Sequence, residues 1–313
     1  MTAPADRWIL ADIPDQAGRT VLVTGTTVGG LGQFTALELA RRGARVILAG
    51  RSQPRLDETQ ASILAEVPAA GLEKLVVDLA DLGSVRRAAA TAAGLGPIDV
   101  LVNNAGVMGT PYHRTPDGLE QQLATNHFGP FLLTGLLLPQ LVASGAGTVV
   151  SVSSQMHRVA RRAPLGDPHV QEGRYQRWPV YGQSKLANLL FAYELDRRAR
   201  RAEVPVKALA AHPGFAATHL AANGQYGRSS GGIASILDAV IKVVSPNSAD
   251  QGAWPTLMAA TADLPGATYV GPDGLAEWGG HPHVTSSNKL SYDETAQRRL
   301  WQISEEVTGV TYP

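Results

Sequence analysis

A tyrosine and a lysine stand four residues apart, at Tyr181 and Lys185, and on a helix this spacing puts both side chains on one face. An ammonium group beside a phenol favours the phenolate, so Lys185 should lower the pKa of Tyr181. A tyrosine tuned in this way can exchange a proton with a carbonyl or alcohol oxygen. Ser154, at the end of an expected strand, could hydrogen-bond the same oxygen. Tyr-Lys pairs with this spacing are also common on helix surfaces, so the pair alone does not establish a catalytic site.

A glycine-rich segment at residues 23–32 joins an expected strand to an expected helix, as nucleotide-binding turns do. Glycines there permit a left-handed backbone and the close approach of a pyrophosphate, and the helix N-terminus offers free N–H groups and a partial positive charge. The candidate cofactor contacts in this turn are Gly25, Thr26, Thr27, Gly30, Leu31 and Gly32. A glycine-rich turn without a ligand and the similar loop of a methyltransferase remain open alternatives.

Arg51 and Ser52 follow the next expected strand, where NAD sites usually have an acid for the ribose 2′-hydroxyl. A guanidinium group there can pair with a 2′-phosphate, so the sequence favours NADP(H) over NAD(H). The arginine also argues against a methyltransferase, which usually has an acid at this position. A solvated arginine at a helix start is the alternative interpretation.

Two further strand ends add candidates at the same edge of the expected sheet. Asp78, followed by Leu79, could bind an adenine amino group or could cap a helix, and the sequence does not decide between the two. Asn104, Ala105 and Gly106 follow a buried strand, and the small residues would let the backbone line a cofactor cleft.

The composition of the 313 residues narrows the function classes. Lys+Arg and Asp+Glu number 27 each, and such a balanced chain has no overall field for holding nucleic acid. The absence of cysteine rules out disulfides, iron–sulfur clusters and a cysteine nucleophile, and the histidines show no ligand spacing, so no metal is expected. No signal peptide is visible, and the longest apolar stretch, residues 131–142, falls short of the roughly 20 residues that a membrane span requires. A cytoplasmic protein is expected.

Strands and helices are expected to alternate, which predicts an α/β fold with one Rossmann-type, doubly wound parallel sheet and helices on both faces. The apolar fraction of 44% suits a sizeable core, and a single domain is expected over residues 1–313. Strands are expected at 20–23, 45–49, 75–77, 100–102, 148–152 and 206–211, and helices at 33–42, 54–66, 81–93, 117–142, 180–201 and 292–307. The helix at 117–142 should be interrupted at 129–130, and the last helix should start with a capping box from Ser291 to Glu294.

The order and spacing of these motifs resemble the short-chain dehydrogenase/reductase family over residues 20–218, with similarity of fold continuing to the C-terminus. The matching residues are Thr24, Gly25, Gly30, Leu31, Gly32, Asp78, Asn103, Asn104, Ala105, Gly106, Asn126, Ser153, Ser154, Tyr181, Lys185, Pro213 and Gly214. Within the family the chain looks most like the retinol dehydrogenase and protochlorophyllide reductase branch, on cues that include residues 49–51 and 300–304.

The resemblance implies a role for each catalytic candidate. Tyr181 would be the general acid/base, and Lys185 would bind the nicotinamide ribose and lower the pKa of Tyr181. Ser154 would orient the substrate oxygen, and Asn126 would hold a water in a proton relay to Lys185. The implied reaction is an NADP(H)-dependent interconversion of a carbonyl and an alcohol, with the hydride carried by the cofactor. A non-catalytic NADP-binding regulator of the same fold is the alternative.

The resemblance also implies contacts beyond the catalytic residues. Pro213, Gly214 and Thr218 would contact the nicotinamide end of the cofactor. Residues 219–247 turn apolar in their second half, which suits a mobile lid over an apolar small-molecule substrate. Family members often dimerise through the helices that hold Asn126 and Tyr181, so the resemblance allows a homo-oligomer.

The chain departs from the family pattern in two places. Either the phosphate loop has one extra residue between Gly25 and Gly30, or Gly29 takes the usual glycine position. The stretch at 155–180, after Ser154, is also long and rich in arginine: Arg158, Arg161, Arg162, Arg174 and Arg177, with His157 and His169. This excursion is either a solvated surface or a basic rim that recognises an acidic substrate.

Overall fold

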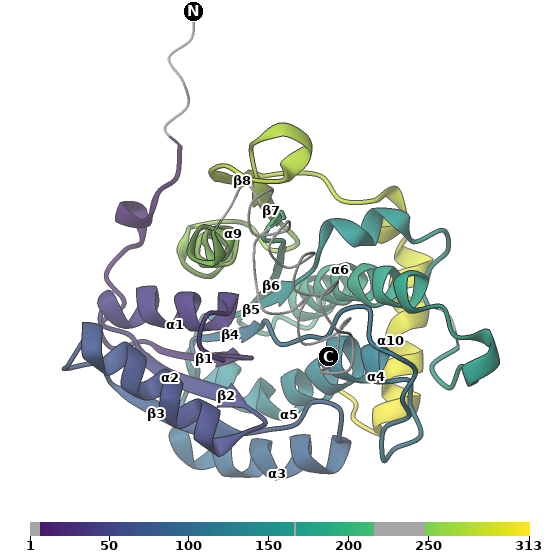
Figure 1. The fold of residues 1–313 in the computed structure, drawn as a ribbon, viewed down its shortest axis with the longest axis horizontal. Helices are drawn as coiled ribbons and strands as arrows, with labels where there is room; N and C mark the ends of the chain where they lie inside the picture. Colours follow the sequence, from purple (N-terminus) through teal and green to yellow (C-terminus); the bar gives the residue numbers. More distant parts are fainter. Residues whose placement is uncertain (1–6, 166, 216–247) are drawn as a thin grey trace, which may run out of the picture.

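The computed structural model describes residues 7–165, 167–215 and 248–313, and in this part of the chain eight strands form one sheet (Figure 1). The strands are β1 Thr20–Thr24, β2 Arg45–Gly50, β3 Leu72–Val76, β4 Val100–Asn103, β5 Gly147–Val152, β6 Val206–Ala211, β7 Tyr269–Pro272 and β8 Pro282–Val284. Their order is β3-β2-β1-β4-β5-β6-β7-β8, parallel from β3 to β7, with β8 antiparallel to β7. The predicted fold class is confirmed. Thr218 and the predicted lid at 219–247 lie outside the described residues.

Helices cover both faces of the sheet. They are α1 Leu31–Arg41, α2 Gln53–Glu66, α3 Leu82–Ala92, α5 Gly129–Ala143, α6 Arg177–Arg201, α9 Ala249–Thr261 and α10 Glu294–Thr308. Because successive strand residues point to opposite faces, Leu22 and Leu101 pack with α3, α5 and α6, whereas Val23 and Val102 pack with α1, α2 and α9. The central strands are therefore apolar on both faces, as parallel strands between two helix layers require.

The sheet topology places the loops that matter for function. The chain runs outward from β1 to β2 and β3, and then returns to β4 on the other side of β1. The loops after β1 and β4 consequently lead away from each other. A crevice forms between them at the carboxyl ends of the strands, and ligands of such sheets bind there.

The helix predicted at 117–142 starts later in the structure than predicted, and its irregular part also lies at a different position. It begins with a short turn, α4 (Gln121–Leu123), whose N-cap Glu120 accepts hydrogen bonds from the N–H groups of Gln122 and Leu123. The irregularity comes before residue 129, because Ala124–Phe128 form a π-helix. Pro130 lies at the start of α5, directly after this π-helical turn.

The predicted capping box at the last helix is wrong. Asp293 caps α10, since its carboxylate accepts hydrogen bonds from the N–H groups of Thr295 and Ala296. Ser291 belongs instead to a 3₁₀ turn at Lys289–Tyr292. Sequence analysis also missed α9, β7 and β8. The two strands have only four and three residues, too few for a clear alternating pattern, and Pro255 lies inside α9.

Helix α10 covers the outer side of α5 and α6 in the same chain, on the right of Figure 1. Its Trp301 is 1% exposed and stacks on Phe191 of α6, with ring centroids 5.9 Å apart. The edge of Phe131 of α5 meets the same indole at 5.0 Å. The family resemblance associates these two helices with dimerisation. Part of their outer surface is thus covered by this chain's own C-terminal helix. No helix in the described ranges is both long and apolar enough to cross a membrane.

Candidate active site

A cleft of about 230 Å³ lies at the carboxyl ends of the parallel strands, bordered by the loops after β1, β2, β3 and β4. The predicted cofactor contacts that line it are Gly25, Thr27, Gly30, Leu31, Arg51, Asp78, Leu79, Asn104, Ala105 and Gly106. Three other predicted contacts lie just behind this surface: Thr26 is fully buried, Gly32 is inside α1, and Ser52 is the N-cap of α2. The structure therefore brings the predicted loops together around one space.

The backbone of the glycine loop distinguishes the two alternatives for its glycine spacing. Gly25 and Gly29 both adopt the left-handed backbone, with φ of +74° and +77°, a conformation that favours glycine. Gly29 thus takes the turn position, and Gly30 becomes the N-cap of α1. A Cβ on Gly32 would lie 2.5 Å from the carbonyl oxygen of Gly25, so glycine is required where the first turn of α1 crosses the loop.

The two asparagines after β4 have different structural roles. Asn104 donates from Nδ2 to the carbonyl oxygens of Thr24 and Gly25, at 2.7 and 3.2 Å, and so holds the glycine loop in place. Asn103 points to the other side, where its Nδ2 donates to Thr134 Oγ1 of α5 at 3.0 Å. Asn104 therefore shapes the cleft mainly by fixing the backbone of the glycine loop.

Two arginines border one end of the cleft. Arg51 was predicted from the sequence; Arg55, in the first turn of α2, was missed. Asp78 does not cap α3, because Asp81 does so by accepting from Ser84 N at 3.0 Å. The Asp78 carboxylate accepts from Ala80 N at 2.9 Å, and the residue lines the cleft. The helix-cap interpretation of Asp78 is therefore wrong.

These features fit a nicotinamide dinucleotide. The glycine backbone leaves room for a pyrophosphate beside the N-terminus of α1, and the two arginines offer positive charge at one end. Thr125 also lines the cleft, and its buried Oγ1 has no hydrogen-bond partner among the described residues. A buried hydroxyl without a partner is costly, and a polar ligand in the cleft would satisfy it.

The predicted catalytic side chains meet where β5 ends and α6 begins. Tyr181 and Lys185 are 2% and 3% exposed, and Ser154 lies close enough to the Tyr181 phenol to affect its pKa. Lys185 Nζ lies 5.8 Å from the centroid of the Tyr181 ring and donates to the carbonyl oxygen of Val152 at 3.1 Å. The helical spacing brings Tyr181 and Lys185 together, and the end of β5 brings Ser154 to the same part of the sheet edge.

Burial, and not Lys185, dominates the pKa of Tyr181 in this structure, which corrects the expected direction. Loss of hydration raises the pKa of this phenol to about 12, against the opposing effect of the hydrogen bond with Ser154. Burial also lowers the pKa of Lys185 to about 8. Both side chains are thus shifted toward their neutral forms. Tyr181 needs additional positive charge or hydrogen bonds at the site before it can ionise near neutral pH.

Asn126 comes from the π-helical turn and holds the loop after β4. Its Oδ1 accepts from Val107 N at 2.8 Å, while its Nδ2 donates to Val107 O and to Ser184 Oγ, both at 2.9 Å. A Cβ at Gly106 would lie 3.0 Å from Asn126 Oδ1 and 3.3 Å from Lys185 Nζ. Asn126 and Lys185 therefore come together beside Gly106. The water relay between them stays a prediction.

The loop after β6 carries the last described candidates, Pro213 and Gly214. Gly214 has φ of +68°, and a Cβ there would lie 2.6 Å from the carbonyl oxygen of Trp278. Its N–H donates to His212 Nδ1 at 3.2 Å, so His212 carries its proton on Nε2. The loop is thus packed tightly against the segment at 277–278.

Glu277 connects this loop to the turn after Ser154. Its carboxylate accepts hydrogen bonds from His212 (2.9 Å), Gln155 (2.5 Å), Arg158 (3.2 Å) and Thr285 (2.8 Å). Burial alone would raise the pKa of Glu277, but the hydrogen bonds from His212 and Thr285 and the charge of Arg158 lower it to about 2. Sequence analysis missed Glu277 because it belongs to no motif and its partners lie far away along the chain.

Known proteins of similar sequence identify the family. Residues 19–165 match the family model described as short chain dehydrogenase. Retinol dehydrogenase 13 of Homo sapiens is 38% identical over 300 residues, which cover 95% of this chain and 86% of that protein. The chain belongs to the short-chain dehydrogenase/reductase family. Polyprenol dehydrogenase of Mus musculus is 38% identical over 305 residues, with the same coverage of 95% and 86%. A solved structure of an uncharacterised protein from Mycobacterium paratuberculosis has 40% identity and a TM-score of 0.79, and the match covers 98% of this chain and 99% of that one.

Membership of the short-chain dehydrogenase/reductase family makes the protein an oxidoreductase of a family that binds nicotinamide cofactors and acts on small molecules. The expected likeness to the retinol dehydrogenase branch is confirmed. The non-catalytic alternative finds no support in these relatives, and neither does a methyltransferase. The roles of individual residues, the preferred cofactor and the substrate go beyond family membership.

Proposed function

We propose that this protein is an NADP(H)-dependent oxidoreductase that interconverts an apolar alcohol and its carbonyl, with Tyr181 as the general acid/base. The observation that carries the proposal is that Tyr181 lies beside Lys185 and close to Ser154, at the sheet edge that also holds the cofactor cleft. A hydroxyl pair of this kind can bind one substrate oxygen and exchange its proton.

The cleft supports the cofactor part of the proposal. The backbone of the glycine loop would hold the pyrophosphate, and Arg51 and Arg55 would hold a 2′-phosphate. Pro213 and Gly214 would border the nicotinamide, which supplies or accepts the hydride. NAD(H) lacks the 2′-phosphate, so it would gain less from the two arginines.

The chain's own residues would manage the proton. Ser154 would donate a hydrogen bond to the carbonyl oxygen and polarise it, and Tyr181 would give that oxygen its proton in the reduction direction. Lys185 would stabilise the resulting phenolate by its charge, provided that it is protonated. Asn126 would fix the loop at Val107 that closes this side of the site.

Two relatives support an apolar substrate, since their names refer to retinol and polyprenol. The surroundings of Tyr181 agree with this choice, because the Trp178 ring meets the Tyr181 ring edge-on with centroids 6.4 Å apart. An apolar wall of this kind leaves the reacting oxygen as the main polar point of recognition.

The test is a turnover assay that follows NADPH and NADH with retinal, an isoprenoid aldehyde and simple ketones. We expect Tyr181→Phe to bind NADPH normally and to lose at least about 100-fold in turnover, the lower end of general acid–base contributions. Tyr193→Phe is the matched control, since Tyr193 is buried on the same helix and its hydroxyl bonds Ser287 at 2.9 Å, outside the site. Turnover above a tenth of wild type in Tyr181→Phe would contradict the proposed role. NADPH binding without turnover of any carbonyl would favour the regulator.

The remaining expectations from the sequence stay predictions. They are a single domain, a cytoplasmic location, a homo-oligomer, and the absence of a metal ion and of nucleic acid as a partner. Thr218 and the lid at 219–247 stay predictions as well.

A further inference from the structure

A cavity of about 810 Å³, which we call the α6 cavity, lies between the excursion after Ser154 and the start of α6. Its walls are largely apolar and include Leu123, Met156, Val159, Trp178 and Val180. Volumes of this size are typical of sites for small organic ligands. The sequence of the excursion is compatible with a solvated surface or with a basic rim, and the cavity beside it favours a binding role.

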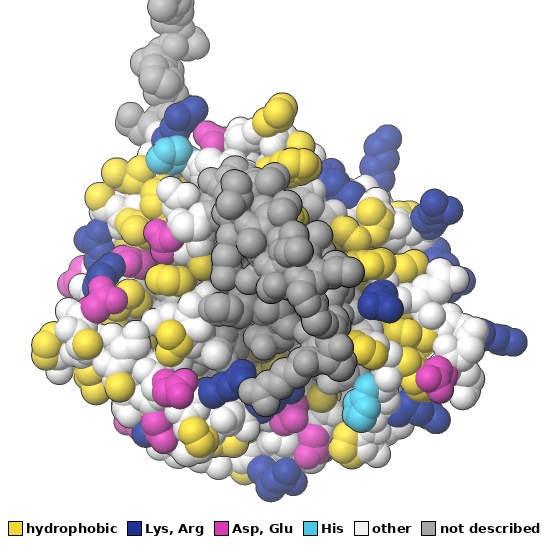
Figure 2. All heavy atoms as spheres, in the orientation of Figure 1, with side chains coloured by type: hydrophobic (Ala, Val, Ile, Leu, Met, Phe, Trp, Pro, Cys, Tyr) yellow, Lys and Arg dark blue, Asp and Glu magenta, His cyan; other side chains and the backbone are white. Residues whose placement is uncertain are grey.

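Three arginines stand at the α6 cavity: Arg161, Arg162 and Arg174. All three are exposed, and within the described ranges their guanidinium groups have no carboxylate partner. Asp167, the one acid among the described residues that line the cavity, accepts a hydrogen bond from His169 N at 2.8 Å. In Figure 2 the right-hand part of the molecule shows Lys and Arg side chains beside apolar ones, over the region of the teal segment before α6 in Figure 1.

Several other arginines of this chain do have a carboxylate partner. Arg41, Arg158 and Arg198 each form an ion pair with a glutamate. Adjacent cations such as Arg161 and Arg162 repel each other, and unpaired they cost a small amount of free energy that a bound anion would recover. A ligand that matches both the apolar cavity and the positive charge at its edge would have an apolar chain that ends in an anionic group.

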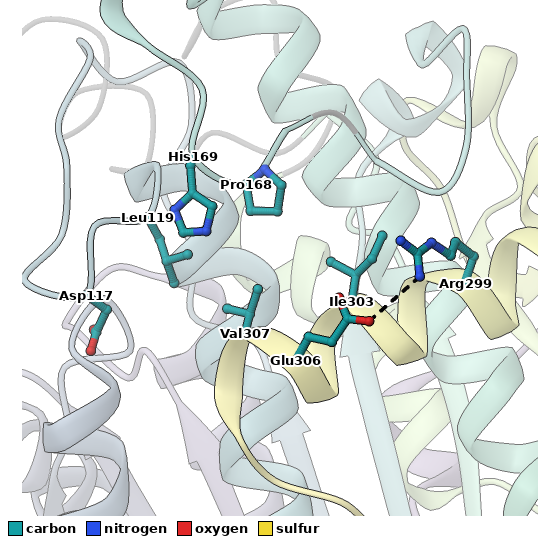
Figure 3. A pocket seen from close by; sticks show the side chains of 8 residues that line it. All are labelled: Asp117, Leu119, Pro168, His169, Arg299, Ile303, Glu306 and Val307. Carbon is teal, nitrogen blue, oxygen red and sulfur yellow. Dashed lines mark ion pairs between the residues drawn. The ribbon is translucent and has the colours of Figure 1, made fainter.

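A neighbouring cavity shows the contrasting case. It has about 550 Å³ and lies between the turn at 117–119, the segment at 168–169 and α10 (Figure 3). There Arg299 is paired with Glu306 at 3.8 Å, and the Asp117 carboxylate accepts a hydrogen bond from Leu82 N at 3.0 Å. Its charged groups already have partners within the chain, so the surface offers no comparable binding charge.

We propose that the α6 cavity binds an amphipathic anion, with its apolar chain among Met156, Val159 and Trp178 and its carboxylate or phosphate at the three arginines. The site is distinct from the cofactor cleft, with which it shares no lining residue. It adjoins the catalytic residues through Trp178, which packs against Tyr181, and through Met156, whose N–H donates to Ser154 Oγ at 3.3 Å. The proposal does not depend on which substrate the enzyme turns over.

The test measures binding to the full protein by calorimetry at low ionic strength, where exposed charges are weakly screened. The probes are decanoate, monodecyl phosphate, decan-1-ol and acetate. We expect the two long-chain anions to bind at least about tenfold more tightly than decan-1-ol, since a hydrogen-bonded charge adds roughly that factor, and acetate to bind too weakly to detect. Equal affinity for decanoate and decan-1-ol would overturn the proposal.

Three variants locate the binding. Arg161→Gln/Arg162→Gln/Arg174→Gln should remove the preference for anions, while Arg87→Gln/Arg200→Gln/Arg201→Gln, with the same change in net charge, should keep it. Val159→Trp should weaken all long-chain probes by filling the cavity, because Val159 lines it and is 50% exposed, so a larger side chain there need not unfold the protein.

Further outcomes would contradict the proposal. Equal losses in the two triple variants would mean that only net charge matters. Loss of binding in Tyr181→Phe would place the ligand in the catalytic site instead. Binding to anionic vesicles without binding of dispersed decanoate would mean that the arginines recognise a membrane surface and not a single amphipathic molecule.

Discussion

His212 and Glu277 share a hydrogen bond of 2.9 Å that joins the end of β6 to the turn at Leu275–Glu277. The same carboxylate accepts a hydrogen bond from Gln155, the residue after Ser154. One glutamate therefore sets the distance between the serine turn and the loop at Pro213 and Gly214. Both loops adjoin the proposed catalytic residues and the proposed nicotinamide contacts.

Removing the Glu277 carboxylate should disturb both loops. We expect Glu277→Ala to lower stability by about 1–3 kcal/mol, because it leaves buried donors unpaired, and to lower turnover through misplacement of Ser154. Glu277→Gln keeps the shape and one acceptor, so its effect should be smaller. Urea unfolding and steady-state kinetics measure the two effects. Glu306→Ala, at an exposed pair on α10, is the control and should change neither. Unchanged turnover in Glu277→Ala would contradict a positioning role.

Because the pKa of Glu277 is depressed, the folding stability of the protein should decrease at acidic pH. Its native pKa is about 2 and its ordinary value is 4.5. The ionised carboxylate therefore stabilises the fold fully above about pH 4.5, and this contribution is lost as the pH falls from there toward 2. In Glu277→Gln the stability should depend less on pH over this range, as measured by urea unfolding from pH 3 to 7. If stability depended on pH equally in wild type and variant, other carboxylates would be responsible for the loss of stability in acid.

The two arginines at the cleft should decide between cofactors. A charge-assisted contact to a 2′-phosphate contributes about 1.5–3 kcal/mol, less at an exposed site, so Arg51→Ala should weaken NADPH binding by about tenfold. Arg55→Ala should have a similar effect, while NADH binding should change little in either variant. Fluorescence titration gives both dissociation constants, and Arg298→Ala on α10 controls for net charge. Equal weakening of NADH and NADPH would mean that the arginines do not contact the 2′-phosphate.

Lys185 should reduce the stability of the protein when the cofactor cleft is empty. Its native pKa is about 8 and its ordinary value is 10.5, so below about pH 8 the fold must keep a buried charge. Lys185→Met removes that cost, and Val152 O keeps its hydrogen bond from Asn188 at 2.9 Å. The variant should therefore be more stable than wild type at pH 7, by about 1–3 kcal/mol, and yet inactive.

The pH dependence distinguishes this explanation from improved packing. As the pH rises from about 8 to 10.5, native Lys185 loses its proton before the unfolded chain does, so the advantage of Lys185→Met should shrink toward zero. Thermal unfolding at several pH values measures the difference. A constant difference from pH 6 to 10 would attribute the gain to packing alone.

Trp301 should be essential for the docking of α10. It is 1% exposed between Phe131 and Phe191, and its ring lies 4.4 Å from the guanidinium carbon of Arg198. Trp301→Ala should lower stability by about 3–5 kcal/mol, as large-to-small changes in a core do. Leu275→Ala is the control, because Leu275 is 94% exposed and its loss should cost less than about 0.5 kcal/mol. Sedimentation of both variants will show whether freeing the outer side of α5 and α6 changes the oligomeric state.

The sequence by itself determined the parallel strands from β1 to β6, the glycine loop and the pairing of Tyr181 with Lys185. These features are local or periodic: a glycine-rich turn lies between a strand and a helix, and a spacing of four residues puts two side chains on one helix face. The location of the candidate site at one edge of the sheet then follows, because the carboxyl ends of parallel strands lie together. For that reason the candidate cofactor and catalytic residues could be named before their distances were known.

Only the tertiary structure decided which groups are buried and which distant segments meet. Burial reverses the expected direction of the Tyr181 pKa, and hydration loss cannot be deduced from a spacing of four residues. Glu277 meets Gln155 and His212 although no motif joins them. The three arginines of the excursion, which have no carboxylate partner among the described residues, gain a chemical meaning only from the cavity beside them. The physical reason is the same in each case: charge and hydrogen-bond energies depend on the surroundings that packing creates, and packing joins residues that are far apart along the chain.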